Sequence, residues 1–197
     1  MTTRVLLVRH AQSTWNAAGR WQGWADPPLS PAGQLAARAA ADDPVLETVT
    51  AVATSDLLRA RGTAAAVAEA RGLGPVHVVR GLRERGAGRW TGLTRPEIDA
   101  GWPGRLGERH ADIPDGESPA AVAARGIAAL HRVAAAFPGT DVLAVSHGAL
   151  IRLVEDQVGG DPVHVPNLAG RWVEVSGGRV VLGPVVILGA FRAEPAA

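Results

Sequence analysis

The chain has 197 residues, of which 47% are hydrophobic and 20% are charged, and its formal net charge is +1. That length suits one domain, the apolar fraction can bury a core, and no apolar run approaches the roughly 20 residues that cross a bilayer. Cysteine, tyrosine and lysine are absent, so all 20 basic residues are arginine, and disulfides, thiol nucleophiles, Schiff-base lysines and phenolic acid–base chemistry are excluded.

Strand and helix patterns alternate along the chain. In chain order, strands are expected at residues 4–8, 50–53, 76–79, 141–145, 171–175 and 179–185. Helices are expected from residue 30, over 57–70, near 96–100, from residue 118 and after residue 148. Serine–proline pairs open the first and fourth of these helices, because serine caps free N–H groups and proline suits the first helical position. The alternation predicts one α/β domain over residues 1–197, with three α/β/α layers and a mixed, mostly parallel sheet.

The segment from about residue 80 to 116 is rich in Gly, Pro, Arg and Trp and has weak periodicity. Such a stretch in a compact domain is typical of a functional lid. Between Gly81 and His110 its arginines outnumber its acids, which predicts a preference for ligands that carry additional negative charge. These arginines are Arg83, Arg85, Arg89, Arg95, Arg105 and Arg109. Two histidines, His110 in this segment and His164 in a later loop, are left open as ligand contacts.

Polar side chains follow the ends of four predicted strands. Arg9 and His10 follow the first strand, Arg59 the second, Glu84 the third and His147 the fourth. Because ligands of open α/β sheets bind outside the carboxyl ends of the strands, we expect these five side chains to converge on one crevice. The set consists of two histidines, two arginines and one glutamate.

Three kinds of chemistry are considered for histidines in such a crevice. A metal site is disfavoured, because arginine beside the ligand opposes a divalent cation and no His-x-x-x-His or acidic cluster accompanies it. A serine hydrolase is disfavoured, because Ser146 beside His147 lacks a Gly-x-Ser-x-Gly elbow. Arginines that flank a histidine fit an anion best, since guanidinium groups match phosphate oxygens and an imidazole lone pair can attack phosphorus. The residues therefore favour phosphoryl chemistry.

The segment Arg9-His10-Ala11 resembles the Arg-His-Gly motif of the histidine phosphatase superfamily, also called the phosphoglycerate mutase-like family. Segments that resemble the family's motifs follow in the family's order and cover nearly the whole chain. They are residues 9–16, 20–29, 54–60, 82–92, 116–118 and 145–148. The resemblance implies a phosphoglycerate mutase-like fold with a six-stranded sheet, in which one strand of the closing hairpin is antiparallel. Ala11 replaces the family's usual glycine and Gln12 its common glutamate, which leaves the substrate preference open.

The resemblance also implies a ping-pong phosphoryl transfer that needs no cofactor and no metal. His10 would attack phosphorus and become phosphohistidine, while Arg9, Arg59 and a cationic His147 would hold the phosphoryl oxygens. Glu84 would protonate the leaving oxygen and then deprotonate the attacking water. The residues expected to border the phosphate or the substrate are Arg9, Asn16, Gln22, Gly23, Arg59, His147 and Gly148.

The leading interpretation is a metal-independent phosphomonoesterase (a phosphatase) that acts on a small phosphorylated metabolite. Two alternatives stay open: a cofactor-dependent phosphoglycerate mutase with the same active centre, and a phospho-ligand-binding module that has lost catalysis. Mutases of this family are longer, with insertions and a tail that exclude water, and a decayed module would be expected to lose His10 or Glu84. Because the arginines are interspersed with acids, we expect a cytoplasmic protein without nucleic-acid or membrane partners. A homodimer is left open.

Overall fold

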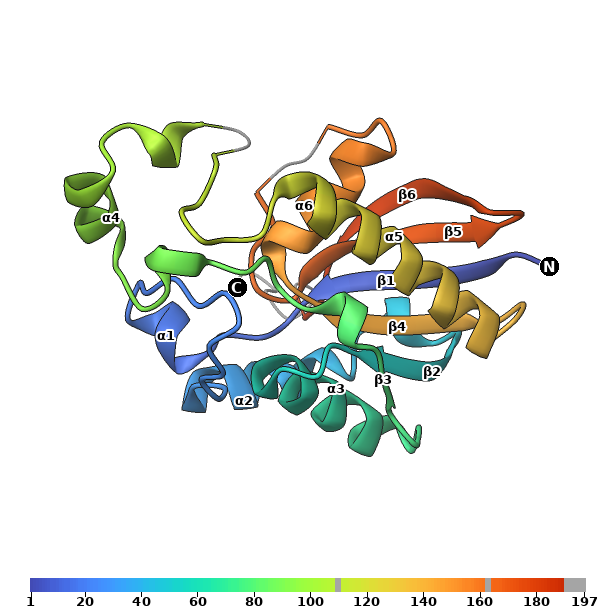
Figure 1. Cartoon of the computed structure of the whole chain (residues 1–197). Coiled ribbons are helices and arrows are strands. Elements are labelled where there is room, and N and C mark those ends of the chain that lie inside the picture. The colour runs from blue at the N-terminus through green and yellow to red at the C-terminus, as the bar shows by residue number, and fades with distance from the viewer. Residues whose placement is uncertain (109–110, 162–163, 190–197) are drawn as a thin grey trace, which may run out of the picture.

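The computed structural model describes residues 1–108, 111–161 and 164–189. Its strands form one six-stranded sheet in the order β3-β2-β4-β1-β5-β6 (Figure 1). The strands are β1 (Thr3–Arg9), β2 (Val49–Thr54), β3 (His77–Val78), β4 (Asp141–Ser146), β5 (Ala169–Ser176) and β6 (Arg179–Ile187). The first four strands pair in parallel, whereas β5 runs antiparallel to both β1 and β6. The predicted mixed, mostly parallel sheet with one antiparallel strand in the closing hairpin is confirmed.

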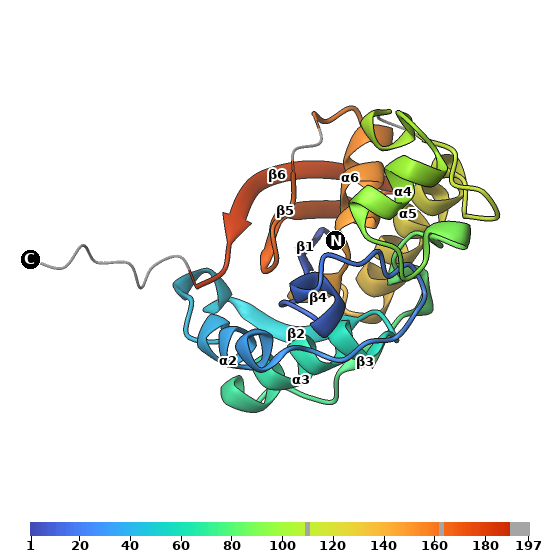
Figure 2. The same cartoon turned by 90° about the vertical axis from the view of Figure 1, so that its left-hand side faces the viewer.

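Helices cover both faces of this sheet and complete the predicted three layers. They are α1 (Thr14–Ala17), α2 (Pro31–Ala40), α3 (Leu58–Arg71), α4 (Arg95–Gly101), α5 (Pro119–Ala136) and α6 (Gly148–Gln157). Helices α2 and α3 lie on one face, and α5 and α6 on the other (Figure 1 and Figure 2). A hydrophobic core lies on each face of the sheet, and alternate side chains of β1 pack into one or the other. Leu6 and Val8 pack on the α2–α3 side, and Val5 and Leu7 pack on the α5–α6 side.

Two helices begin at the predicted serine caps. Ser30 Oγ accepts a hydrogen bond from Gly33 N at 3.0 Å, and Ser118 Oγ accepts one from Ala121 N at 3.2 Å. Four single turns of 3-10 helix lie in the connections: Pro44–Leu46, Arg80–Leu82, Gly88–Trp90 and Arg105–Gly107. In the described part of the chain, no helix is both long and apolar enough to span a bilayer.

Two local features differ from the prediction. The strand expected at 76–79 is only His77–Val78, because the chain turns into the 3-10 helix Arg80–Leu82 directly after Val79, whose N–H still bonds to Thr54 O at 2.8 Å. The sequence predicts no helix at α1, because four residues are too few to show a helical period. Its signal is instead the capping box that begins at Ser13.

The described parts of the predicted lid, residues 80–108 and 111–116, include segments that lie beside α1 at the end of the sheet where β1 and β4 terminate (Figure 1). The lid contains α4 and a small apolar core made of Trp90, Ile98, Ala111 and Ile113. Arg109 and His110, both named above as candidates, lie outside the described residues. The segment therefore stands where it can border a ligand at the carboxyl ends of the strands.

Candidate active site

The side chains expected at the strand ends come together beyond β1 and β4. These strands are parallel neighbours with Arg9 paired to Ser146, so the next residues, His10 and His147, leave the sheet side by side. Their ring centroids are 5.1 Å apart. From the first turn of α3, Arg59 Nε lies 3.2 Å from His10 Nε2. Sheet register and one helix start therefore bring together three side chains that are far apart in the sequence.

A cavity of about 540 Å³ opens beside His10. Most of the predicted site residues form part of its wall: Arg9, His10, Asn16, Gln22, Gly23, Glu84 and Gly148. Arg59 and His147 have no exposed surface and lie against His10. The predicted residues thus form one site, with some of them at the cavity surface and two of them buried beneath it.

The imidazole of His10 is held in one orientation. Its Nδ1 lies 2.6 Å from the carbonyl oxygen of Ala11, and because a carbonyl only accepts, Nδ1 carries the proton. Nε2 therefore keeps its lone pair. The backbone is fixed as well: His10 N donates to Ser146 O at 2.9 Å, and Asn167 Nδ2 donates to His10 O at 2.7 Å. Sequence reasoning missed Asn167, which lies in a late loop without a motif.

Arg59 is a fully buried cation beside His10. Besides its contact with His10, Nη2 donates to Gly23 O and Nη1 to Ala25 O, both at 2.9 Å. Burial, with a smaller contribution from the charge of Arg9, lowers the pKa of Arg59 to about 10 against the opposing effects of Glu84 and Asp26, so the side chain remains charged near neutral pH. Of its five N–H groups, three are engaged by described residues, and two have no partner among them.

The structure corrects the expectation of a cationic His147. Its side chain is completely buried, and neither ring nitrogen has a hydrogen-bond partner among the described residues. Burial lowers the pKa of His147 well below its ordinary value, and the charge of Arg59 lowers it further. The ring is therefore neutral at pH 7. Burial, followed by the charge of Arg59, also lowers the pKa of His10, so both imidazoles are uncharged.

The free energy of unfolding is expected to fall when the pH is lowered from about 7.5 to about 5.5. His10 and His147 take up protons at these pH values only when the chain unfolds, because their pKa values in the folded protein lie well below the ordinary value. The unfolded state then binds more protons, and stability changes by up to about 1.4 kcal/mol per pH unit for each histidine. Urea unfolding at the two pH values measures this. In the double variant His10→Gln, His147→Gln, the free energy of unfolding should depend less on pH than in the unchanged protein. His77→Gln, at an exposed edge position, is the control and should keep the dependence of the unchanged protein. Equal pH dependence in the unchanged protein and both variants would contradict the prediction.

Glu84 reaches the same cavity from the stretch after β3. Its Oε1 accepts hydrogen bonds from Arg85 N at 2.8 Å and Leu150 N at 3.3 Å, and its Oε2 accepts one from Ala149 N at 3.4 Å. The carboxyl group therefore lies at the N-terminus of α6, where backbone N–H groups hold its position. Within residues 1–108, 111–161 and 164–189, no group of three or more His, Asp or Glu side chains is placed to hold a metal ion.

Ser13 organises a polar part of the cavity wall that contains Asn16 and Gln22. Its Oγ lies 3.1 Å from Asn16 Oδ1 and 2.7 Å from Gln22 Oε1, and Asn16 Oδ1 also accepts the N–H of Ser13. The amide oxygens of Asn16 and Gln22 are thus occupied, whereas their NH₂ groups have no partner among the described residues and can donate to an anion in the cavity. The sequence analysis named both amides but gave no role to Ser13.

The arginines at the cavity differ from the expected set. Arg83 is occupied by Asp56, with two hydrogen bonds of 2.7 and 2.8 Å. The arginines in the cavity wall are Arg9, Arg20, Arg85, Arg95 and Arg152, against the carboxylates Glu84 and Glu108, and His164 lines it as well. Arg152 lies one turn after Gly148 on α6, a spacing that could have identified it. The excess of positive charge is present, and the preference for additional negative charge stays a prediction.

Comparison with known proteins gives a consistent result. A model of the histidine phosphatase superfamily (branch 1) matches residues 5–178. The glucosyl-3-phosphoglycerate phosphatase of Mycolicibacterium vanbaalenii is 36% identical over 190 residues, which cover 88% of this chain and 84% of the relative. The probable phosphoglycerate mutase GpmB of Photorhabdus laumondii is 37% identical over 169 residues, covering 82% and 77%. A solved mycobacterial glucosyl-3-phosphoglycerate phosphatase in complex with VO3 superposes with a TM-score of 0.77 at 33% identity, covering 91% of this chain and 96% of that one.

Proposed function

We propose, because the chain belongs to the histidine phosphatase superfamily (branch 1), that it hydrolyses small phosphate monoesters through a phosphohistidine on His10. The enzyme class follows from the family and from its phosphatase relatives. The observation that carries the assignment of the nucleophile is the orientation of the imidazole. Its proton is on Nδ1, towards Ala11 O, so Nε2 carries the lone pair. Nε2 accepts a hydrogen bond from Arg59 Nε and is the nitrogen that can attack phosphorus once a phosphoryl group takes up that donor.

In the first step, Nε2 of His10 bonds to phosphorus while the bond between phosphorus and the ester oxygen breaks. Protonated Glu84 gives its proton to that oxygen, and the alcohol leaves. In the second step, the Glu84 carboxylate takes a proton from water, the water oxygen bonds to phosphorus, and the nitrogen–phosphorus bond breaks. Inorganic phosphate leaves, and both side chains return to their starting states.

The positive charge for both steps comes from arginine. Arg9 uses one N–H group on Val165 O at 2.8 Å, which leaves four for phosphoryl oxygens. Arg59 keeps two, and the unpartnered nitrogens of the neutral His147 add one donor. Such fixed donors stabilise the transition state of phosphoryl transfer without help from a metal ion. We therefore propose full activity in the presence of a chelator.

The cavity favours a small, anionic phosphate ester. Its volume of about 540 Å³ leaves room for an alcohol beside the phosphoryl group. Arg20, Arg95 and Arg152 in its wall can attract a second negative group. The inactive-module alternative loses support, because His10 and Glu84 are both present and line one cavity. The cytoplasmic location and the homodimer stay predictions.

Hydrolysis is expected to exceed isomerisation. With 3-phosphoglycerate and a bisphosphoglycerate primer, inorganic phosphate should form faster than 2-phosphoglycerate, with a chelator present throughout. The reason is that the cavity beside His10 admits water to the phosphoenzyme. The measurement follows both products in one reaction. Faster formation of 2-phosphoglycerate would assign the chain to the mutase alternative, and loss of activity on adding the chelator would contradict metal independence.

A further inference from the structure

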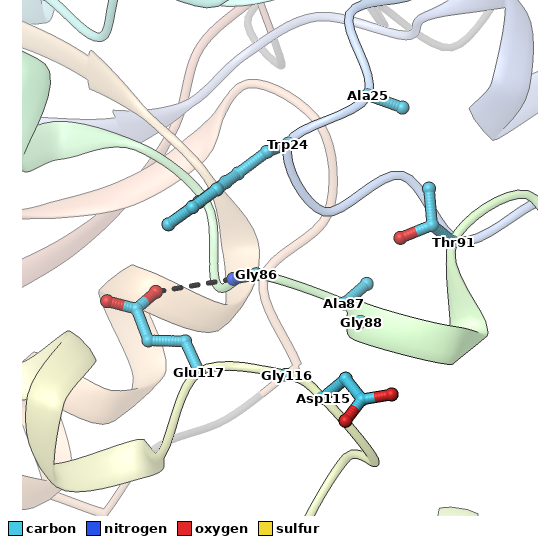
Figure 3. A pocket seen from close by; sticks show the side chains of 9 residues that line it. All are labelled: Trp24, Ala25, Gly86, Ala87, Gly88, Thr91, Asp115, Gly116 and Glu117. Carbon is cyan, nitrogen blue, oxygen red and sulfur yellow. Dashed lines mark hydrogen bonds between the residues drawn. The ribbon is translucent and has the colours of Figure 1, made fainter.

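Glu84 lies in a stretch without regular secondary structure, residues 83–87, that separates two cavities. On one side is the cavity of about 540 Å³, whose wall includes Glu84 and Ala87. On the other side is a second cavity of about 360 Å³, lined by Gly86, Ala87 and Glu117 among others (Figure 3). Ala87 lines both cavities, and hydrogen bonds from neighbouring elements hold the stretch between them.

Arg125 of α5 donates two hydrogen bonds to this stretch and one to the residue pair just before it. Its Nη1 donates to the carbonyl oxygens of Gly81 at 3.0 Å and Arg83 at 2.6 Å, and its Nη2 donates to that of Glu84 at 2.8 Å. Nε and Nη2 also donate to the two carboxylate oxygens of Glu117, each at 2.7 Å. All five N–H groups of the guanidinium are thus engaged.

Glu117 extends this network to the residues that follow Glu84. Its Oε2 accepts the N–H of Gly86 at 3.2 Å (Figure 3), and its backbone oxygen accepts a hydrogen bond from Arg85 Nε at 2.7 Å. The carbonyl oxygen of Glu84 has a second donor in Trp24 Nε1 at 2.8 Å. The backbone is therefore tied before, at and after Glu84.

We propose that Arg125, supported by Glu117, is a positioning residue. It fixes the backbone of Glu84 so that the carboxyl group stands where it can transfer a proton to the leaving oxygen. Arg125 does not line the cavity of about 540 Å³, so among the described residues it acts through the backbone of Glu84. The inference rests on the proposed function, in which Glu84 protonates the leaving oxygen. A displacement of about 1 Å in such a group can cost on the order of 100-fold in rate.

Two esters of similar size test the proposal. Benzyl phosphate has an alcohol leaving group that needs a proton, whereas p-nitrophenyl phosphate has a leaving group that departs without one. For Arg125→Met, kcat/KM is expected to fall about 10- to 100-fold with benzyl phosphate and by less than about threefold with p-nitrophenyl phosphate. Arg125→Lys, with fewer donors, should lie between Arg125→Met and the unchanged protein. Arg132→Met, at an exposed position of the same helix, is the matched control and should change neither value.

A double variant separates positioning from a general loss of structure. With Glu84→Gln already present, Arg125→Met should cause no further loss with benzyl phosphate, because the group that it positions is gone. Equal losses with both esters, or a full loss added to that of Glu84→Gln, would overturn the proposal. If Arg125→Met fails to fold in a thermal unfolding assay, Arg125→Lys and Glu117→Gln carry the same comparison.

The proposed function fails in a different way. If Glu84→Gln itself lowers kcat/KM equally for both esters, Glu84 is not the acid, and the positioning role falls with that assignment. If Glu84→Gln discriminates between the esters and the Arg125 variants do not, only the positioning role is overturned.

Discussion

Replacing His10 by alanine is expected to lower kcat by at least about three orders of magnitude, the size expected for deleting a covalent nucleophile. No other histidine of the described chain combines a wall position in the cavity, a proton fixed on Nδ1 and an arginine at Nε2. Steady-state kinetics measures the loss. His131→Ala on α5, outside the cavity wall, is the matched control and should retain full activity.

The same prediction specifies where the phosphoryl group is carried. After rapid quenching of a reaction, mass spectrometry should find acid-labile phosphate on residue 10. The serine hydroxyls near the site are engaged: Ser146 Oγ donates to Leu82 O at 2.8 Å, and Ser13 Oγ contacts the two amides described above. Phosphate on either serine would disprove the histidine mechanism, as would a His10→Ala protein with activity close to normal.

Arg59→Met is expected to lower kcat/KM by about 100- to 1,000-fold, as for the loss of a preorganised donor to a developing charge. The change also leaves the buried carbonyl oxygens of Gly23 and Ala25 without their donor, which costs about 1–3 kcal/mol each in folding free energy. Arg59→Lys keeps the charge but cannot reach His10 and both carbonyls at once. It should therefore recover part of the stability and little of the rate.

Kinetics and urea unfolding of the same proteins check the second prediction. Arg61→Met is the matched control, because Arg61 is an exposed arginine on the same helix. Folded Arg59→Met with more than a tenth of normal kcat/KM would show that Arg59 has only a structural role. A large loss confined to KM would assign it to substrate binding alone.

The sequence is sufficient for the parts of the site that depend on local pattern. The apolar stretch at 4–8 predicts a buried strand, and its end places Arg9 and His10 at the carboxyl edge of the sheet. The serine–proline pairs predict helix starts, because a cap needs only neighbouring residues. The glutamate and the second histidine follow from the same rule of strand ends, which needs no knowledge of loops.

Other features depend on contacts between distant residues, which no local pattern reports. The neutral state of His147 results from its complete burial, and burial is a property of the folded chain. In the sequence, Arg125 is indistinguishable from any other basic residue on a helix. Its hydrogen-bond acceptors lie 41, 42 and 44 residues earlier in the chain, so no local pattern identifies them. From the sequence, Arg83 is expected to be a free cation of the lid. In the folded chain, its charge is paired with Asp56, which lies 27 residues earlier.

The spacing of the two site histidines has a consequence for how this kind of protein can change over evolution. His10 and His147 each follow a paired position of β1 and β4, and paired strands lie about 4.8 Å apart in any sheet. The 5.1 Å between their rings therefore starts from paired backbone positions of the sheet and not from residues 80–116. Insertions or exchanges in residues 80–116 leave that spacing unchanged. The two site histidines can therefore stay in place while insertions and substitutions in residues 80–116 change which alcohol the cavity accepts.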